Sequence, residues 1–162
     1  MPKVFFAKTN SEGKIPSKRK EDSAYDIYAA FPGDVFEIPP HQTKLIPTGI
    51  ASAVEPGWGF QIEERGSTGS IGMKKSAGVI DSGYRGEWFI AITNTNNVPI
   101  VISKQADKVN VTNTIITYPY SKAICQAKLE KIYEAEIVEI DYEDLKNMTS
   151  ERGMGKLGDS GK

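Results

Sequence analysis

Short runs of strand-forming residues, interrupted by turn residues, constrain this chain more than any other feature of its sequence. Roughly ten runs are rich in Val, Ile, Phe, Tyr and Thr, and clusters of Gly, Pro, Asn and Ser separate them. The runs span residues 3–8, 24–30, 34–38, 44–54, 58–64, 86–94, 98–103, 108–118, 122–132 and 135–141. So many short strands with almost no helix predict an all-β fold of the jelly-roll or β-barrel type.

Helix signals are weak, and the chain has the length of a single domain. One or two helical turns are expected within residues 67–75, and a second short helix within 141–148. With 162 residues the chain fits one β domain, which we place at residues 1–148. Pro47 indicates an edge strand or a bulge within residues 44–54, because proline donates no ladder hydrogen bond.

The last stretch, "TSERGMGKLGDSGK" at residues 149–162, differs in composition from the rest. Its glycines and polar residues offer little surface to bury, so alone it is expected to be flexible. It is either a frayed end or an arm whose backbone N–H groups and Arg152 become ordered around an anion. The phosphate-loop pattern G-x-x-x-x-G-K-[ST] does not occur in the sequence, so a P-loop is excluded.

Residue counts exclude several classes of function. Cys125 is the single cysteine, which rules out a disulfide framework and a thiolate metal cage. His41 is the single histidine, which rules out Ser-His and Cys-His catalysis. The net charge of −1 gives no basis for nucleic-acid binding, and we interpret Lys18–Lys20 as a solvated loop. The start "MPKVFFAKTN" has no long apolar segment, so we expect no membrane span and a cytoplasmic location.

Carboxylates, arginine, tyrosine and backbone amides remain as candidates for chemistry. Asp26 lies within "SAYDIYA", and Arg65 precedes a Gly-Ser-Thr-Gly turn. Asp81 and Tyr84 belong to "SAGVIDSGYRGEWFIAI", which is predicted to be a β-hairpin with the aspartate at its mouth. Arg152 lies in the last stretch. Each of these residues alone has a structural explanation, as a strand-end acid, a surface cation or a turn-former.

Together and in this order, the segments resemble the trimeric deoxyuridine triphosphatase (dUTPase) family. The family's five motifs correspond to "SAYDI" (23–27, family S-A-G-Y-D-L), "ERGSTG" (64–69, family P-R-S-G/S), "GVIDSGYRGE" (78–87, family G-V-I-D-x-x-Y-x-G), "AICQAKL" (123–129, family R-I-A-Q-L) and "ERGMGKLGDSG" (151–161, family R-G-x-G-G-F-G-S-T-G). The resemblance implies a dUTPase-type β fold. It also implies hydrolysis of dUTP to dUMP and pyrophosphate, which limits uracil in DNA and supplies dUMP for thymidylate synthesis.

The resemblance assigns the third motif to the nucleoside. Asp81 would orient and deprotonate the water that attacks the α-phosphorus. Tyr84 would lie against the deoxyribose and fill the space that a ribose 2′-hydroxyl needs. The backbone that meets the uracil edge would come from Gly78, Val79 and Ile80.

The resemblance assigns the other motifs to the triphosphate. Mg²⁺ would be held mainly by the phosphate oxygens and water, with Asp26 binding it through water. Arg65 and Gln126 would contact the phosphates and align the α-phosphoryl group. The arm, which closes over the nucleotide, would contribute Arg152, Leu157, Gly158 and Ser160. Because the family's active sites combine motifs from several subunits, a C₃ homotrimer is implied.

The chain departs from the family pattern in the second and fifth motifs. The serine that follows the motif-two arginine is Gly66 here, and Ser67 comes one place later. We expect Ser67 to take the catalytic hydroxyl role and Gly66 to stay in contact with the substrate. Leu157 stands where the family has an aromatic residue, so the base would be covered without ring stacking.

Two rival functions remain on the same scaffold. A dCTP deaminase relative would need a catalytic glutamate three residues before Asn94, where this chain has Ala91. A non-catalytic nucleotide-sensing regulatory protein would need no water-activating Asp81. The long segment 103–121 is either an extended hairpin or a partner-binding surface. Asp26, Arg65, Asp81, Tyr84, Gln126 and Arg152 are all retained, which favours catalysis.

Overall fold

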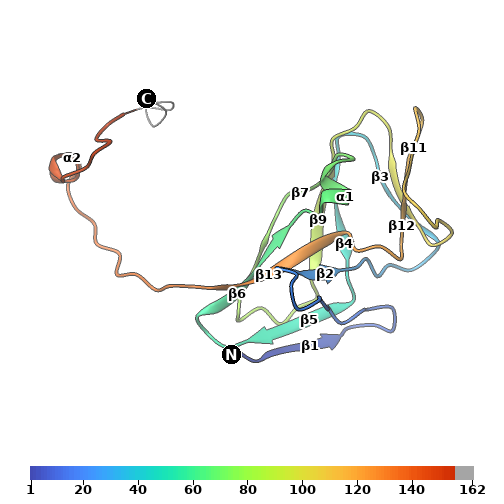
Figure 1. Cartoon of the computed structure of the whole chain (residues 1–162), viewed down its shortest axis with the longest axis horizontal. Coiled ribbons are helices and arrows are strands. Elements are labelled where there is room, and N and C mark those ends of the chain that lie inside the picture. Colours follow the sequence, from blue (N-terminus) through green and yellow to red (C-terminus); the bar gives the residue numbers. More distant parts are fainter. Residues whose placement is uncertain (156–162) are drawn as a thin grey trace. The chain divides into compact units, whose positions relative to one another are not determined.

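The computed structural model describes residues 1–155, in which thirteen strands and two short helices follow one another (Figure 1). The strands are β1 (Val4–Lys8), β2 (Tyr25–Ile27), β3 (Val35–Ile38), β4 (Thr43–Pro47), β5 (Ile50–Val54), β6 (Trp58–Glu63), β7 (Met73–Lys75), β8 (Val79–Ile80), β9 (Phe89–Asn94), β10 (Ile100–Ser103), β11 (Asn110–Val111), β12 (Ile116–Pro119) and β13 (Cys125–Lys131). The helices are α1 (Gly66–Gly69) and α2 (Tyr142–Asn147). The chain separates into two compact units, residues 1–132 and 133–162.

The strands of the first unit form four small sheets. Their orders are β1-β5, β11-β12-β10-β3, β2-β13-β6-β8 and β4-β9-β7. The pairs are antiparallel, apart from the parallel pair of β10 and β12. Partners are often far apart in sequence, as where Gln126 of β13 lies opposite Asp26 of β2. The predicted all-β fold is confirmed.

A core rich in isoleucine and aromatic residues holds these sheets together. Ten of its isoleucines are at most 1% exposed: Ile27, Ile38, Ile46, Ile50, Ile62, Ile90, Ile92, Ile100, Ile102 and Ile124. Trp88 is fully buried, with its ring centroid 5.6 Å from that of Phe6 on β1 and 5.1 Å from that of Phe60 on β6. Its indole N–H donates to Ser52 Oγ at 3.2 Å, which satisfies its one polar group.

The run at residues 44–54 divides into two strands that belong to different sheets. β4 is an edge strand and ends at Pro47, in agreement with the prediction from proline. Gly49 then adopts φ +65°, a conformation that glycine adopts without steric cost. A Cβ at this position would lie 2.8 Å from the Cα of Gly13, so the close approach of the two chains also requires glycine.

Two strand predictions are wrong. Residues 135–141 are extended and exposed but belong to no sheet, because the described part of the second unit contains no strand for them to pair with. The predicted hairpin at residues 76–92 does not form either, because β8 pairs with β6 whereas β9 pairs with β4 and β7. Trp88 explains the second result. The backbone N–H of Trp88 donates to the carbonyl of Ile50 at 2.8 Å, and its ring is buried in the core. These contacts direct the chain away from β8 and into the sheet of β4 and β7.

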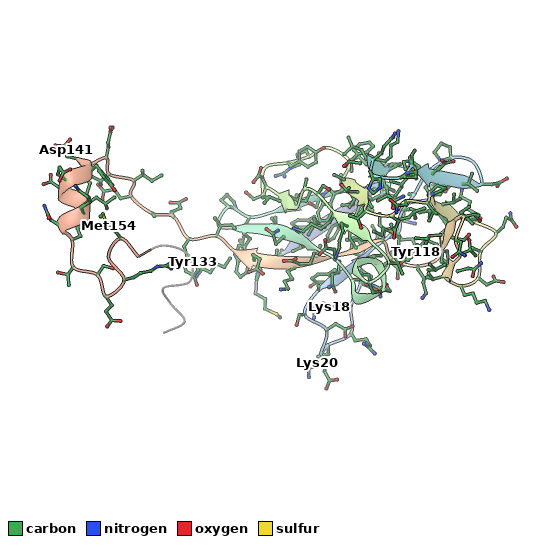
Figure 2. The ribbon with its side chains drawn as sticks, turned by 90° about the horizontal axis from the view of Figure 1, so that it is seen from above. Lys18, Lys20, Tyr118, Tyr133, Asp141 and Met154 are labelled. Carbon is green, nitrogen blue, oxygen red and sulfur yellow. The ribbon has the colours of Figure 1, made fainter. Side chains whose placement is uncertain are left out.

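The helix predictions are confirmed in part. α1 is a single turn, which agrees with the one or two turns expected within residues 67–75, and residues 73–75 form β7. α2 belongs to the second unit, and Figure 2 shows Asp141 at its start. Its acidic first turn and basic last turn complement the helix dipole. Among residues 1–155, no helix is long and apolar enough to cross a membrane.

Candidate active site

A charged cavity of about 660 Å³ opens where β2 with the segment before it, the start of β13 and the residue preceding α1 meet. It is lined by Ser17, Lys18, Arg19, Asp22, Ser23, Ala24, Asp26, Arg65 and Gln126. Three of the predicted site residues therefore share one cavity, together with cations that the sequence analysis did not assign to it. Such a mixture of cations and carboxylates suits a polyanionic ligand that is bound with a cation.

Strand pairing positions Asp26 opposite Gln126, and Arg65 lies directly before α1. Asp26 lies on β2 directly opposite Gln126 on β13, and Gln126 lies opposite Glu63 on β6. Arg65 Nε donates to Asp26 Oδ1 at 3.0 Å, and Gln126 Nε2 donates to the carbonyl of Glu64 at 2.7 Å. The ion-paired side chains are 29% and 36% exposed, so the pair contributes at most about 1 kcal/mol to stability. Its main effect is to orient the guanidinium toward the cavity.

Ser67 lies beside the same guanidinium. Arg65 Nη1 is 3.5 Å from Ser67 Oγ and donates to the carbonyl of Ala123 at 3.4 Å. The α1 turn is fixed because the N–H of Arg65 donates to Oγ1 of the buried Thr68 at 3.1 Å. A Cβ at Gly66 would meet no atom within 4 Å, so the position tolerates a side chain. The hydroxyl of Ser67, which stands one place later than the serine of the family motif, thus lies next to Arg65.

Two neighbours of this group were not expected from the sequence. Tyr118 is fully buried, its hydroxyl donates to the carbonyl of Ala123 at 2.7 Å, and burial raises the pKa of its phenol. Cys125 adjoins Gln126 on β13, and burial raises the pKa of its thiol well above the ordinary value. Burial makes this thiol an inert core group rather than a nucleophile. The position of Tyr118 next to the site could not be predicted from the sequence, because the residues around it are typical of any core strand.

An aromatic cavity of about 350 Å³ lies beside β8. It is lined by Gly57, Trp58, Gly59, Phe60, Gln61, Val79, Ile80, Asp81, Ser82, Glu130 and Ile132. Two backbone segments lie close together here, because the carbonyl of Gly78 accepts a hydrogen bond from the N–H of Ile62 on β6 at 2.7 Å. A Cβ at Gly78 would lie 2.9 Å from Gln61 Nε2 and 3.1 Å from the carbonyl oxygen of Ile62, which explains the glycine.

Tyr84 is placed next to Asp81 by a turn. Its N–H donates to the carbonyl of Asp81 at 3.1 Å, and its hydroxyl donates to the carbonyl of Glu87 at 2.9 Å. The ring lies over Gly86, where a Cβ would come within 2.5 Å of the phenolic oxygen. The ring is therefore pre-positioned but still exposed at the surface.

The predicted residues thus form two groups at opposite edges of the β2-β13-β6-β8 sheet. Three strand spacings, about 14 Å, separate β2 from β8. Gln126 lies opposite Glu63 and Ile80 lies opposite Phe60, which adds about 10 Å along β6. Within residues 1–155, no hydrogen bond or ion pair joins the side chains of the two groups.

The predicted arm residues are described in part. Arg152 belongs to the second unit, where its Nε donates to the carbonyl of Gly155 at 3.2 Å. Leu157, Gly158 and Ser160 lie outside the described residues.

Comparison with known proteins identifies the family. The dUTPase family model matches residues 11–109. The deoxyuridine 5′-triphosphate nucleotidohydrolase of Nautilia profundicola is 32% identical over 99% of this chain and 99% of its own length. The chain belongs to the dUTPase family. The enzyme of the same name from Candida albicans is 34% identical over 93% of this chain and 83% of its own.

The fold agrees with that family. The dUTPase of Staphylococcus bacteriophage 80alpha, solved with dUPNHPP, matches with a TM-score of 0.77 over 99% of both chains. The identity is 20%, so this likeness concerns the fold alone. The resemblance drawn from five short motifs is confirmed by comparisons that span the chain.

Proposed function

We propose that this protein hydrolyses dUTP to dUMP and pyrophosphate, and that the charged and the aromatic cavity are the two halves of its active site. Membership of the dUTPase family and relatives that are dUTP nucleotidohydrolases support the reaction. The observation that carries the site is the grouping of Asp26, Arg65, Ser67 and Gln126 in one place and of Gly78–Asp81 with Tyr84 in another.

The charged cavity would hold the triphosphate. Arg65 offers the planar fork that binds phosphate oxygens bidentately, and its ion pair with Asp26 keeps the fork in place. Gln126 uses one N–H group on the carbonyl of Glu64 and has a second for a phosphate oxygen. Ser67 would donate its hydroxyl close to the scissile bond. These contacts align the α-phosphoryl group for attack.

The charged cavity also fits Mg²⁺. Among residues 1–155, no three His, Cys, Asp or Glu side chains cluster as a metal cage. A single carboxylate in a phosphate-binding cavity is the donor set for an ion held mainly by substrate and water, and Asp26 supplies it. When bound, Mg²⁺ would neutralise charge that develops on the phosphates. Asp26 would bind it through water, while Arg65 keeps that carboxylate oriented.

The aromatic cavity would hold the nucleoside. The backbone at Val79 and Ile80 forms an edge strand, whose free polar groups can pair with the uracil edge. Tyr84 would pack on the deoxyribose and exclude a 2′-hydroxyl. Asp81 follows directly and is exposed, so its carboxylate can accept a proton from the attacking water.

A homotrimer would bring the two halves together. Ile80 lies opposite Phe60 on β6, and Arg65 comes five residues after Phe60, so about 16 Å along the chain separates Arg65 from the residue next to Asp81. We therefore expect that one chain alone would not place Asp81 beside the phosphates held by Arg65. A C₃ arrangement sets the aromatic cavity of one copy against the charged cavity of the next. Residues 149–162 would then close over the nucleotide through Arg152, Leu157, Gly158 and Ser160. We expect this assembly in the reducing cytoplasm, where the single cysteine stays free.

The two rival functions have less support. Ala91, which stands at the position of the deaminase glutamate, is buried in β9 and offers no acid or base. A nucleotide sensor needs no water-activating carboxylate, yet Asp81 is present at the cavity that would hold the nucleoside. The test is ³¹P NMR of the protein with Mg²⁺ and dUTP, UTP, dTTP or dCTP. We expect dUMP and pyrophosphate from dUTP alone; dUTP that is bound but left intact would favour the sensor.

A further inference from the structure

The loop at residues 17–22 lines the charged cavity, although its sequence resembles an ordinary solvated turn. Lys18 and Arg19 both line that cavity beside Asp26, Arg65 and Gln126, whereas Lys20 does not. Figure 2 shows Lys18 and Lys20 on the same loop, which projects from the sheets of the first unit. Two lysines only two places apart therefore differ in their access to the site.

The loop is fixed relative to the site by backbone contacts. The N–H of Asp26 donates to the carbonyl of Ser17 at 3.1 Å, so the start of the loop is attached to the strand that carries the metal-binding carboxylate. The N–H of Asp22 donates to the carbonyl of Arg19 at 3.2 Å and closes a turn. Arg19 also pairs with Asp22 through Nε at 3.0 Å and Nη2 at 2.9 Å, which holds the pKa of that carboxyl below its usual range.

The charge balance of the cavity singles out Lys18. Arg65 is paired with Asp26 and Arg19 with Asp22, so these four charges cancel. Lys18 Nζ instead donates to two main-chain carbonyls, of Arg19 at 3.3 Å and of Asp22 at 2.7 Å. An ammonium group has three donors, so one remains available. Among residues 1–155, no salt bridge joins Lys18 to a carboxylate, and its charge adds to that of Arg19 near Asp22.

The fourth motif makes this charge more important. The pattern R-I-A-Q-L begins with arginine, but this chain has Ala123 at that place. Ala123 is buried, and its carbonyl accepts hydrogen bonds from Arg65 and Tyr118, so no cation enters the cavity there. A triphosphate carries several negative charges, which the proposed Mg²⁺ would compensate only in part, so a further cation in the cavity favours its binding.

We propose that Lys18 is a phosphate-binding residue of this dUTPase, contacting the β- and γ-phosphates of the bound nucleotide. This inference rests on the proposed function and extends it to a segment before the first motif. The third donor of Lys18 would bind a terminal phosphate oxygen as a point charge, in the way lysine commonly binds phosphates. Because dUMP has no β- or γ-phosphate, the contact would discriminate triphosphate substrate from monophosphate product.

The experiment compares Lys18→Ala with Lys20→Ala, which removes the same charge from the same loop but outside the cavity. Titration calorimetry with Mg²⁺ measures Kd for the non-hydrolysable analogue dUpNHpp and for dUMP. We expect Lys18→Ala to raise the Kd of dUpNHpp about tenfold and to change that of dUMP less than twofold. Lys20→Ala should change both less than twofold, and Lys18→Arg should restore most of the triphosphate affinity.

Equal effects of the two alanine variants, or an equal loss of dUMP and dUpNHpp affinity in Lys18→Ala, would overturn the proposal. Thermal unfolding of each variant checks that the loop change leaves the fold intact. Turnover of dUTP by the unmodified protein is measured alongside. Absence of turnover contradicts the proposed function, whereas turnover with equal lysine effects contradicts only the role of Lys18.

Discussion

The charged cavity lies toward the β2 edge of the β2-β13-β6-β8 sheet and the aromatic cavity lies at its β8 edge, and the two differ in the groups that line them. The charged cavity consists of side chains held by ion pairs, such as Arg65 with Asp26 and Arg19 with Asp22. The aromatic cavity consists of closely approaching backbone at Gly78 and of rings such as those of Trp58 and Phe60. The first suits a flexible polyanion, and the second suits a flat base.

The two cavities therefore suit two kinds of selectivity, one for charge and one for the shape and hydrogen-bonding pattern of a base. Charge is recognised by cations that tolerate small displacements, so several residues can share the task. A base is recognised by backbone groups at fixed positions, so the aromatic side depends on the course of a few residues around β8. Substitutions in the two cavities should therefore change different kinetic constants.

The largest effect is expected from Asp81→Asn. Removal of the proposed general base should lower kcat about 10³-fold while the Kd of dUpNHpp changes only a few-fold, because in the proposed mechanism the carboxylate acts on water. Single-turnover hydrolysis and calorimetry measure the two constants separately. Asp107→Asn, at an exposed loop position, is the control. Activity above a tenth of normal in Asp81→Asn would show that another group activates the water.

Arg65→Lys should have the next largest effect, on the other cavity. Lysine keeps the charge but loses the fork that contacts Asp26, Ser67 and the phosphates, so kcat/KM should fall about 10²-fold. Steady-state kinetics with dUTP checks this. Arg85→Lys, at an arginine that lines neither the charged nor the aromatic cavity, should change kcat/KM less than twofold. Similar losses in both variants would mean that the charged cavity has no special need of a planar cation.

Tyr84→Ala should change selectivity more than rate. Without the ring, the ratio of kcat/KM for UTP to that for dUTP should rise about tenfold, because the 2′-hydroxyl finds space. Tyr84→Phe should keep the discrimination, since it loses only the hydrogen bond to the carbonyl of Glu87. Competition between the two nucleotides in one assay measures the ratio. An unchanged ratio in Tyr84→Ala would place the discrimination elsewhere.

The sequence predicted the fold class well, and the structure brings three of the predicted site residues, Asp26, Arg65 and Gln126, into one cavity. Turn chemistry and five ordered motifs sufficed, because strand runs and functional residues both leave local patterns. The pairing of β8 with β6 was missed, because it depends on where the ring of Trp88 is buried and no local pattern encodes that. The cavity position of Lys18 was missed for a similar reason, since it follows from the bridge between Ser17 and Asp26.

The proposed division of the active site between copies rests on the separation of Arg65 from Asp81 along β6, and it can be tested directly. Arg65→Ala and Asp81→Asn, each nearly inactive alone, are co-expressed with different tags, and the mixed assemblies are assayed with dUTP. If each site joins two neighbouring copies, a trimer that contains both variants has one intact site of three. About three quarters of randomly assembled trimers contain both variants, so the mixture should regain about one quarter of normal activity. Mixed assemblies no more active than the separate variants would contradict a shared site.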